Sequence, residues 1–209
     1  MTTTEIAPRG SEQRMPTDRL LTWIYLLGGA VGLAASAALL LEQFALLAEP
    51  DYIAACTFDQ VLSCNSVMES SQAAAFGIPN TLIGVTAFSV VLTAGVVLHS
   101  GFAAPRWFWT GLQLGSTFGV LFVHWLIYQS LYTIQALCPY CMVVWAVTIP
   151  IFWYTTLHNL PLLRPRGHLA HGLVFGVLRR HLTVLAAWYL AVAALVLHAF
   201  GDYWATLLP

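Results

Sequence analysis

The sequence contains no lysine and has few charges of either sign. Only 8% of its 209 residues are charged, whereas 59% are hydrophobic; an average soluble domain has roughly 25% charged residues. Too few polar side chains are present to cover a water-exposed surface, which excludes an ordinary soluble protein. The eight basic residues are all arginines and the formal net charge is −1, so the chain has no basic stripe for nucleic acid. We expect an integral membrane protein that does not bind nucleic acid.

Cysteine is also scarce, and the four cysteines fall into two pairs. Cys56 and Cys64 lie in a polar stretch, whereas Cys138 and Cys141 form a CPYC motif at the start of an apolar run. No histidine precedes His99, and structural zinc sites usually draw their ligands from closely spaced pairs. We therefore predict no metal. Two interpretations stay open, namely inert structural disulfides and pairs that exchange electrons as dithiols and disulfides.

Five apolar stretches are long enough to cross a bilayer, whose core of about 30 Å requires roughly 20 residues of α-helix. They cover residues 20–41, 79–98, 107–131, 139–157 and 182–200. This pattern predicts an all-α membrane protein. The triplet Ala35, Ser36, Ala37 resembles a signal-peptide cleavage site, but the apolar run continues past it to Leu41, which favours an uncleaved first span.

All eight arginines fall on one side of the membrane in this arrangement. Three precede the first span, one lies between the second and third, and four lie between the fourth and fifth. The positive-inside rule assigns that side to the cytoplasm. The N-terminus is then cytoplasmic, and the C-terminus and all four cysteines lie at the outer face, in a compartment that permits disulfides.

The same pattern predicts four segments. Residues 1–18 are polar and aperiodic and are expected to form a disordered cytoplasmic tail. Residues 19–160 form a four-helix body with an outer loop at about 43–78. Residues 161–181 form a cytoplasmic loop, and residues 182–209 contain the fifth span and an outer tail.

Cys138 and Cys141 stand where an outer connection becomes the fourth span. Pro139 suits the first helical position, and a spacing of three puts both thiols on the first turn of the helix. Unpaired backbone N–H groups and the positive end of the helix dipole stabilise a thiolate there. We expect Cys138 to be the more exposed and exchangeable thiol and Cys141, one turn deeper, to face a lipid-soluble oxidant.

Four motifs follow one another along the chain: the Cys56 and Cys64 pair with seven residues between, NSVMES at 65–70, FGIP at 76–79, and CPYC at the start of the fourth span. Together they resemble the vitamin K epoxide reductase family in its bacterial form. The resemblance covers about residues 20–157.

This resemblance implies a four-helix transmembrane bundle around a quinone, menaquinone or ubiquinone, with a peripheral fifth helix and an outer half-helix cap after Cys64. It implies an enzyme of the bacterial inner membrane that reoxidises a thioredoxin-fold, DsbA-like protein and so supports disulfide formation in exported proteins. Some relatives carry a thioredoxin-like domain after the fifth span. This chain ends at Pro209, so we expect the partner to be a separate protein.

The resemblance also assigns roles to the thiols. Cys56 and Cys64 match the shuttle pair, and Cys138 and Cys141 match the active-site pair. A partner thiolate would attack the shuttle disulfide at Cys56, and the released Cys64 would attack Cys138. Cys141 would then face the quinone.

Three further quinone-pocket candidates follow from the family motifs. Ser70 matches a hydroxyl position of the family, although serine also caps helices for local reasons. Phe76 belongs to the FGIP motif. Trp145 stands where the animal enzymes have a quinone-contacting tyrosine; it can stack on a quinone and donate through its N–H. Asn80 comes too early in its span to match the asparagine of the animal enzymes, so epoxide chemistry is not carried over.

His124 and Tyr128 share one face of the third span and are the remaining candidates for the quinone pocket. An ionisable residue inside a membrane suggests a function, and His124 could move a proton during quinone reduction. The alternative is a histidine that bonds to a neighbouring helix.

Three other functions stay open. The first is vitamin K quinone or epoxide reduction. The second is a DsbB-like oxidase of unrelated architecture, but in that bundle the CxxC precedes the loop pair, whereas here it follows. The third is a non-enzymatic membrane protein held by disulfides or binding a metal.

Overall fold

The computed structural model describes residues 16–49, 51–160, 176 and 180–207. Among those residues the regular structure is helical, apart from an isolated bridge between Leu62 and Leu137. Five helices are long and apolar enough to cross a membrane: α1 (Pro16–Ala48), α3 (Asn80–His99), α4 (Arg106–Gln129), α5 (Pro139–Asn159) and α7 (His181–Ala199). The prediction of an all-α membrane protein is confirmed.

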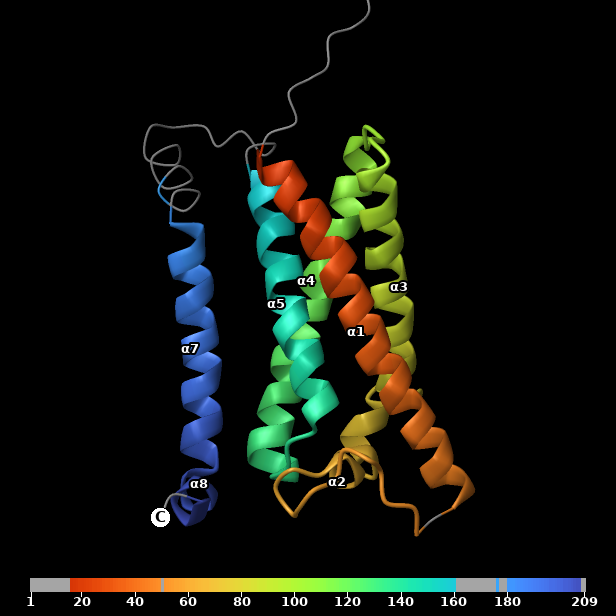
Figure 1. Cartoon of the computed structure of the whole chain (residues 1–209), viewed down its shortest axis with the longest axis vertical. Coiled ribbons are helices and arrows are strands. Elements are labelled where there is room, and N and C mark those ends of the chain that lie inside the picture. Colours follow the sequence, from red (N-terminus) through yellow and green to blue (C-terminus); the bar gives the residue numbers. More distant parts are fainter. Residues whose placement is uncertain (1–15, 50, 161–175, 177–179, 208–209) are drawn as a thin grey trace, which may run out of the picture.

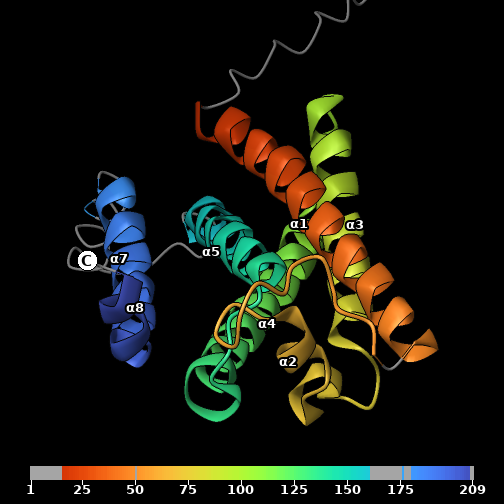
Figure 2. The ribbon, with the colours of Figure 1, turned by 60° about the horizontal axis from the view of Figure 1, so that its bottom comes forward.

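Helices α1, α3, α4 and α5 form a bundle in which α1 packs against α3 and α5, and α4 packs against α5 (Figures 1 and 2). Glycines let the backbones of α1 and α3 approach each other closely. A Cβ atom on Gly29 would lie 2.8 Å from the backbone nitrogen of Leu92, and one on Gly95 would lie 2.9 Å from that of Leu26. Helices in a membrane associate through such backbone contacts because lipid offers no hydrophobic drive between them.

The fifth long helix, α7, stands to one side of this bundle (Figure 1). Its attachments include polar ones: Tyr189 donates a hydrogen bond to the carbonyl of Ala146 at 2.5 Å, and Trp153 donates one to the carbonyl of His181 at 3.2 Å. The short helix α8 (Gly201–Leu207) follows α7 at the same end of the molecule as the cysteine loop (Figure 1).

Three short elements lie at the end of the bundle where α1 ends and α5 begins: α2 (Cys64–Met68), η1 (Ser71–Ala74) and the π-helical turn η2 (Ser130–Ile134). Ser63 caps α2 by accepting a hydrogen bond from the amide of Ser66 at 3.1 Å. Gln135 follows η2 with a φ of 56°, in the left-handed region. This corner reverses the chain from α4 into α5.

The first helix extends beyond its predicted end. It reaches Ala48 instead of residue 41, so the outer loop begins later than the predicted residue 43. Glu42, Gln43 and the alanines and leucines after them are good helix formers, and Glu42 holds the loop that follows. Most of the predicted tail at 1–18 and most of the predicted loop at 161–181 lie outside the described residues.

The starts of α1, α4 and α7 lie at one end of the molecule, and α2 with the cysteine loop lies at the other (Figure 1). The described arginines Arg19, Arg106 and Arg180 stand near those starts. These three arginines and the cysteines therefore lie at opposite ends, as the span pattern predicts.

Candidate thiol exchange site and membrane cavity

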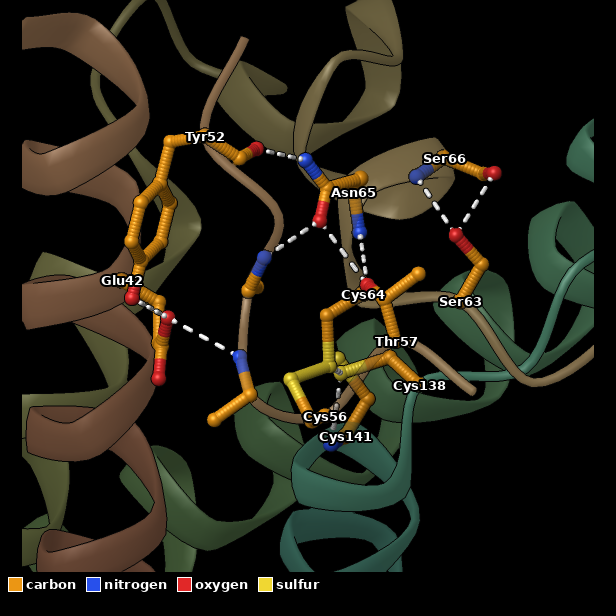
Figure 3. Close-up of a disulfide and its surroundings, with 12 residues drawn as sticks. Glu42, Tyr52, Cys56, Thr57, Ser63, Cys64, Asn65, Ser66, Cys138 and Cys141 are labelled. Carbon is orange, nitrogen blue, oxygen red and sulfur yellow. Dashed lines mark hydrogen bonds between the residues drawn. A yellow bond between two sulfur atoms is a disulfide. The ribbon is translucent and has the colours of Figure 1, made fainter. Parts of the chain in front are cut away.

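Three of the four sulfur atoms meet at the start of α5. Cys56 and Cys64 form a disulfide, and the Sγ of Cys64 lies 3.1 Å from the Sγ of Cys138 (Figure 3). Cys138 and Cys141 are both free thiols. Cys64 and Cys138 are 74 positions apart in the sequence, yet the loop pair and the CPYC pair are close enough to exchange a disulfide.

A short backbone pairing places these two sulfur atoms side by side. Leu137 donates from its amide to the carbonyl of Val61 at 2.6 Å and accepts from the amide of Ser63 at 3.0 Å. Ser63 directly precedes Cys64, and Leu137 directly precedes Cys138. Two adjacent hydrogen bonds between these segments therefore set the register that brings the cysteines together.

Asn65 organises the segment that leads to Cys56. Its Oδ1 accepts from the amide of Ala54 at 2.9 Å and from the hydroxyl of Thr57 at 2.8 Å, and its Nδ2 donates to the carbonyl of Tyr52 at 2.8 Å (Figure 3). An asparagine side chain that mimics backbone groups is well suited to such a turn. In the sequence, Asn65 stands out only as the first residue of the NSVMES motif, which does not predict this bonding role.

Glu42 fixes the same segment to the extended end of α1. Its carboxylate accepts from the hydroxyl of Tyr52 at 2.8 Å and from the amide of Ala55 at 3.4 Å (Figure 3). The hydrogen bond to this carboxylate raises the pKa of Tyr52. Sequence reasoning missed Glu42 because its role depends on the helix continuing past the predicted span.

The thiols are more deeply buried than their sequence positions suggested. The exposed fractions of Cys56, Cys64 and Cys138 are 5%, 0% and 0%, whereas Cys141 is partly exposed. Our expectation that Cys138 is the more exposed thiol of its pair is wrong. The loop packs down on the helix end, where Leu39, Ala54 and the cysteines form one apolar cluster.

Cys138 nevertheless sits in an environment that favours a thiolate. A hydrogen bond with the Cys141 thiol is the largest cause lowering the pKa of Cys138, burial opposes it, and the backbone amides of Cys141 and Tyr140 lower it further. The amide of Cys141 lies 3.5 Å from the Cys138 sulfur. The start of α5 therefore stabilises a negative charge on this sulfur.

A cavity of about 760 Å³ extends through the bundle from Cys141. Its walls come from α1, α3, α4 and α5. Among the described residues, α3 and α4 make little contact with each other, so this cavity separates them. Gly111, Gly115 and Gly119 of α4 line it, and a Cβ atom on either of the first two would meet nothing within 4 Å. Small residues on α4 thus widen the cavity.

The cavity suits a flat apolar ring with a hydrocarbon tail. Its volume falls within the range of about 300–1,000 Å³ typical of small-molecule pockets, and most of its lining is apolar. Cys141, Trp145 and Thr148 line it along α5. They place a thiol, an indole and a hydroxyl on one wall, where a quinone could be held against the Cys141 sulfur.

The other predicted pocket residues divide into two groups. Trp145 lines the cavity. Phe76 is not among the lining residues, but its ring lies 5.5 Å from that of Phe122 and 6.2 Å from that of Phe118, and both of these residues line the cavity. Ser70 does not line the cavity. Its hydroxyl donates to the carbonyl of Val67 at 2.7 Å, a local bond to nearby backbone, although its side chain does not cap the η1 helix that follows.

His124 and Tyr128 do not line the cavity either. The Nδ1 of His124 bonds to the carbonyl of Val120 at 2.7 Å, and its Nε2 accepts from Trp188 of α7 at 2.9 Å. Tyr128 is exposed and contacts the ring of Tyr132. His124 therefore makes the bond to a neighbouring helix that we kept as its alternative, and the structure gives it no contact with the cavity.

The sulfur atoms of Cys56, Cys64 and Cys138 lie within 4.8 Å of one another, which is the one cluster of metal-type ligands found in the described part of the chain. Two of these sulfur atoms are joined in a disulfide and do not offer thiolates. The geometry thus suits sulfur exchange better than metal binding, and the absence of a metal stays a prediction.

The model of the vitamin K epoxide reductase family matches residues 23–156, well over half of the chain. No curated protein matches the chain. The matched region contains all four cysteines, the helices that surround the cavity and the loop that brings Cys64 to Cys138. This chain belongs to the vitamin K epoxide reductase family and is an oxidoreductase of the membrane.

Proposed function

We propose that this protein passes electron pairs from a thioredoxin-fold partner to a membrane quinone and thereby supports disulfide formation in exported proteins. The observation that carries this proposal is the 3.1 Å separation of the Cys64 and Cys138 sulfur atoms, with Cys141 next along the helix and facing the cavity. One cysteine pair thus lies in the outer loop, while the second pair joins that loop to an apolar cavity.

The exchange proceeds by thiolate displacement. A partner thiolate attacks Cys56, forms a mixed disulfide with it and releases Cys64 as a thiolate. Cys64 then attacks Cys138 of an oxidised CPYC pair and releases Cys141. When the second partner thiolate resolves the first mixed disulfide and Cys56 resolves the second, the partner is oxidised and Cys138 and Cys141 are both reduced. The pairing in the structure, with the shuttle pair oxidised and the CPYC pair reduced, matches this stage.

The second half-reaction restores the CPYC disulfide. Joining Cys138 to Cys141 releases two electrons and two protons, which are what the reduction of a quinone to a hydroquinone consumes. A bound quinone supplies the higher reduction potential that sets the direction, where 30 mV corresponds to about 1.4 kcal/mol for two electrons. The chain itself places the Cys141 sulfur at the cavity and lets Cys138 resolve the pair.

Partner access requires a local opening of the loop, because Cys56 is only 5% exposed. The bonds from Asn65 and Glu42 to residues 52–57 must loosen for a partner thiolate to approach. Ile53 and Phe58 flank Cys56 and are 72% and 71% exposed. They offer an apolar contact for the partner beside the sulfur that it attacks.

The proposed location is a bacterial cytoplasmic membrane, with the cysteine end outside. The separation of arginines and cysteines to opposite ends supports this orientation under the positive-inside rule. The partner is then a separate extracytoplasmic protein. We do not extend the proposal to epoxide reduction, since the Asn80 amide is engaged with Gln72 and Ala75 of the cap.

The test is a reconstitution of the purified protein in lipid vesicles with menaquinone or ubiquinone and a reduced DsbA-like protein. We expect the quinone absorbance to fall as partner disulfides form, with one quinone consumed per disulfide. A Cys141→Ala variant should consume none. Full quinone reduction by this variant would overturn the proposal.

A Cys64→Ala variant tests the partner step separately. Its free Cys56 thiol should attack an oxidised DsbA-like protein and accumulate as a mixed disulfide, because Cys64 is no longer present to resolve it. A Cys56→Ala variant serves as the matched control and should give far less adduct. Equal trapping by both variants would contradict the assignment of Cys56 as the residue that meets the partner.

A further inference from the structure

The chain between the two loop cysteines forms a closed turn around Asp59. The Oδ1 of Asp59 accepts hydrogen bonds from the amides of Val61 and Leu62, each at 2.8 Å. The carbonyl of Leu62 in turn accepts from the amide of Phe58 at 2.8 Å. This turn belongs neither to the cavity nor to the cysteines themselves. It is nevertheless the segment that directs Cys64 toward Cys138.

The turn leads directly into the backbone pairing that sets the exchange geometry. The carbonyl of Val61 accepts a hydrogen bond from the amide of Leu137, and the amide of Ser63 donates one to the carbonyl of Leu137. Along the chain, a single residue lies between Asp59 and Val61, and Ser63 directly precedes Cys64. A displacement of the turn therefore moves Cys64 relative to Cys138.

Helix α8 holds this turn from the opposite side. The hydroxyl of Tyr203 donates to Oδ2 of Asp59 at 2.7 Å. The side chains of Tyr203 and Trp204 pack in the same apolar cluster as Val61, Leu62 and Leu137. Both segments of the backbone pairing thus share an apolar cluster with the C-terminal helix.

The support for α8 comes from α7, which is attached to the bundle at separate points. Trp188 donates to His124 of α4 at 2.9 Å, and Tyr189 donates to the carbonyl of Ala146 of α5 at 2.5 Å. At its outer end, Val196 and Phe200 join the cluster that contains Leu137. The fifth helix, α7, therefore links the membrane bundle to the loop that contains Cys56 and Cys64.

We propose that Tyr203 is a positioning residue for the exchange between Cys64 and Cys138, and that α7 and α8 form a brace for the shuttle loop. This inference deepens the proposed function and rests on it for the direction of electron flow. The contact acts through Asp59: Tyr203 holds the carboxylate, the carboxylate closes the turn, and the turn keeps Val61 paired with Leu137.

The charge on Asp59 supports this arrangement. The hydrogen bond from the amide of Leu62 is the largest cause lowering the pKa of Asp59, and the hydroxyl of Tyr203 lowers it further. The carboxylate is therefore ionised at neutral pH, and hydrogen bonds to an ionised group are stronger than neutral ones.

The experiment measures the Cys64 to Cys138 disulfide directly in a Cys56→Ser, Cys141→Ser background of the full chain. The purified protein is equilibrated with mixtures of reduced and oxidised glutathione. Forming the Cys64 to Cys138 bond consumes two thiols and converts one oxidised glutathione into two reduced ones. Alkylation of the remaining free thiols gives the fraction of protein that carries the Cys64 to Cys138 disulfide. From that fraction and the glutathione concentrations follows the effective concentration of the Cys64 thiol at the Cys138 thiol.

We expect Tyr203→Phe to lower this effective concentration by about fivefold, the size of effect that follows from losing one hydrogen bond. Asp59→Asn should lower it as well, and the double variant should fall little below the lower single variant, because both changes break the same contact. Tyr132→Phe and Asp202→Asn are matched controls at the same outer end and should leave the value unchanged.

A second measurement separates positioning from general damage. In a Cys56→Ser, Cys64→Ser background, glutathione equilibration reports on Cys138 and Cys141 alone, and Tyr203→Phe should not change that value. An unchanged Cys64 to Cys138 value in Tyr203→Phe, or an equal loss in both backgrounds, would overturn the inference. Neither measurement uses quinone or partner, so failure of the proposed function in vesicles remains a distinct result.

Discussion

The outer loop and the cavity wall lie in contact at Cys141, yet they are built in opposite ways. The loop is held by side chains with several assigned hydrogen bonds each, such as Asn65, Glu42 and Asp59. The cavity wall is mostly apolar, and on α4 it is lined by glycines with open space beside them. The hydrogen bonds of the loop fix the positions of its residues, whereas the apolar residues and glycines of the cavity wall leave room for a ligand.

This difference follows from the chemistry that each region supports. Disulfide exchange requires one sulfur atom to approach another directly, so small displacements of the loop are costly. A lipid-soluble ring needs an apolar space, and apolar contacts are not directional. We therefore expect changes in the loop to affect the exchange steps, and changes in the cavity wall to affect quinone binding.

The largest effect should come from the Cys138 sulfur, which faces Cys64 of the loop. Cys138→Ser should reduce partner-driven quinone reduction about a thousandfold, which corresponds to roughly 4 kcal/mol of barrier, because no other thiol of the chain receives the bond from Cys64. Quinone absorbance measures the rate. Ser66→Ala changes an exposed residue of the neighbouring helix α2 and removes the hydrogen bond from its hydroxyl to that of Ser63. It should retain activity; a similar loss there would show that the assay reports folding.

A smaller effect on the loop side should come from Asn65→Ala. The change removes three side-chain hydrogen bonds to residues 52–57, each worth about 1 kcal/mol, so the amides of this segment should exchange hydrogen faster. Hydrogen exchange followed by mass spectrometry measures this. Asn65→Asp keeps the acceptor for Ala54 and Thr57 and should give an intermediate result, while faster exchange in α3 as well would contradict a local role.

On the cavity side, Gly115→Val should fill space without unfolding the protein. A Cβ atom there meets nothing within 4 Å, so we expect a nearly unchanged melting temperature and an increase of about fivefold in the KM for quinone, equivalent to roughly 1 kcal/mol. Gly29→Ala is the contrasting variant, since its Cβ would lie 2.8 Å from the nitrogen of Leu92. It should lower the melting temperature. A normal KM in stable Gly115→Val would exclude this wall from the quinone site.

The smallest effect should be a pH dependence of the loop alone. The folded pKa of Asp59 is depressed, so the stability contributed by this carboxylate is fully present above its ordinary unfolded value of about 3.9 and is lost as pH falls through the folded pKa. Tyr203→Phe should raise that folded pKa and move the loss to higher pH. Amide exchange of residues 58–62 against pH measures it, with Asp59→Asn expected to be insensitive to pH in this range.

Much of the membrane architecture was predictable because it depends on local composition. Each of the five spans appears as a helix, since a run of about 20 apolar residues has few other stable states in a bilayer. The exposure of Cys138 was not predictable. Its position on the first turn of α5 was correct, but Cys64 and the outer loop, distant in sequence, cover it.

The partner of His124 illustrates the same limit. A histidine in an apolar span suggests either a functional group or a hydrogen bond between helices, and periodicity cannot separate the two. The structure places Trp188 of α7 against it, in a helix that begins more than fifty residues later in the sequence. Likewise, Tyr203 carries no sequence pattern that points to Asp59.

The sequence by itself determined the five spans, the opposite placement of arginines and cysteines along them, and the two cysteine pairs that resemble a known family. Only the tertiary structure decided that Cys64 faces Cys138, that the cavity begins at Cys141, and that α8 contacts the shuttle loop. The physical reason is range: hydrophobic length and charge bias act on neighbouring residues, whereas these contacts join segments that meet only after the helices have packed.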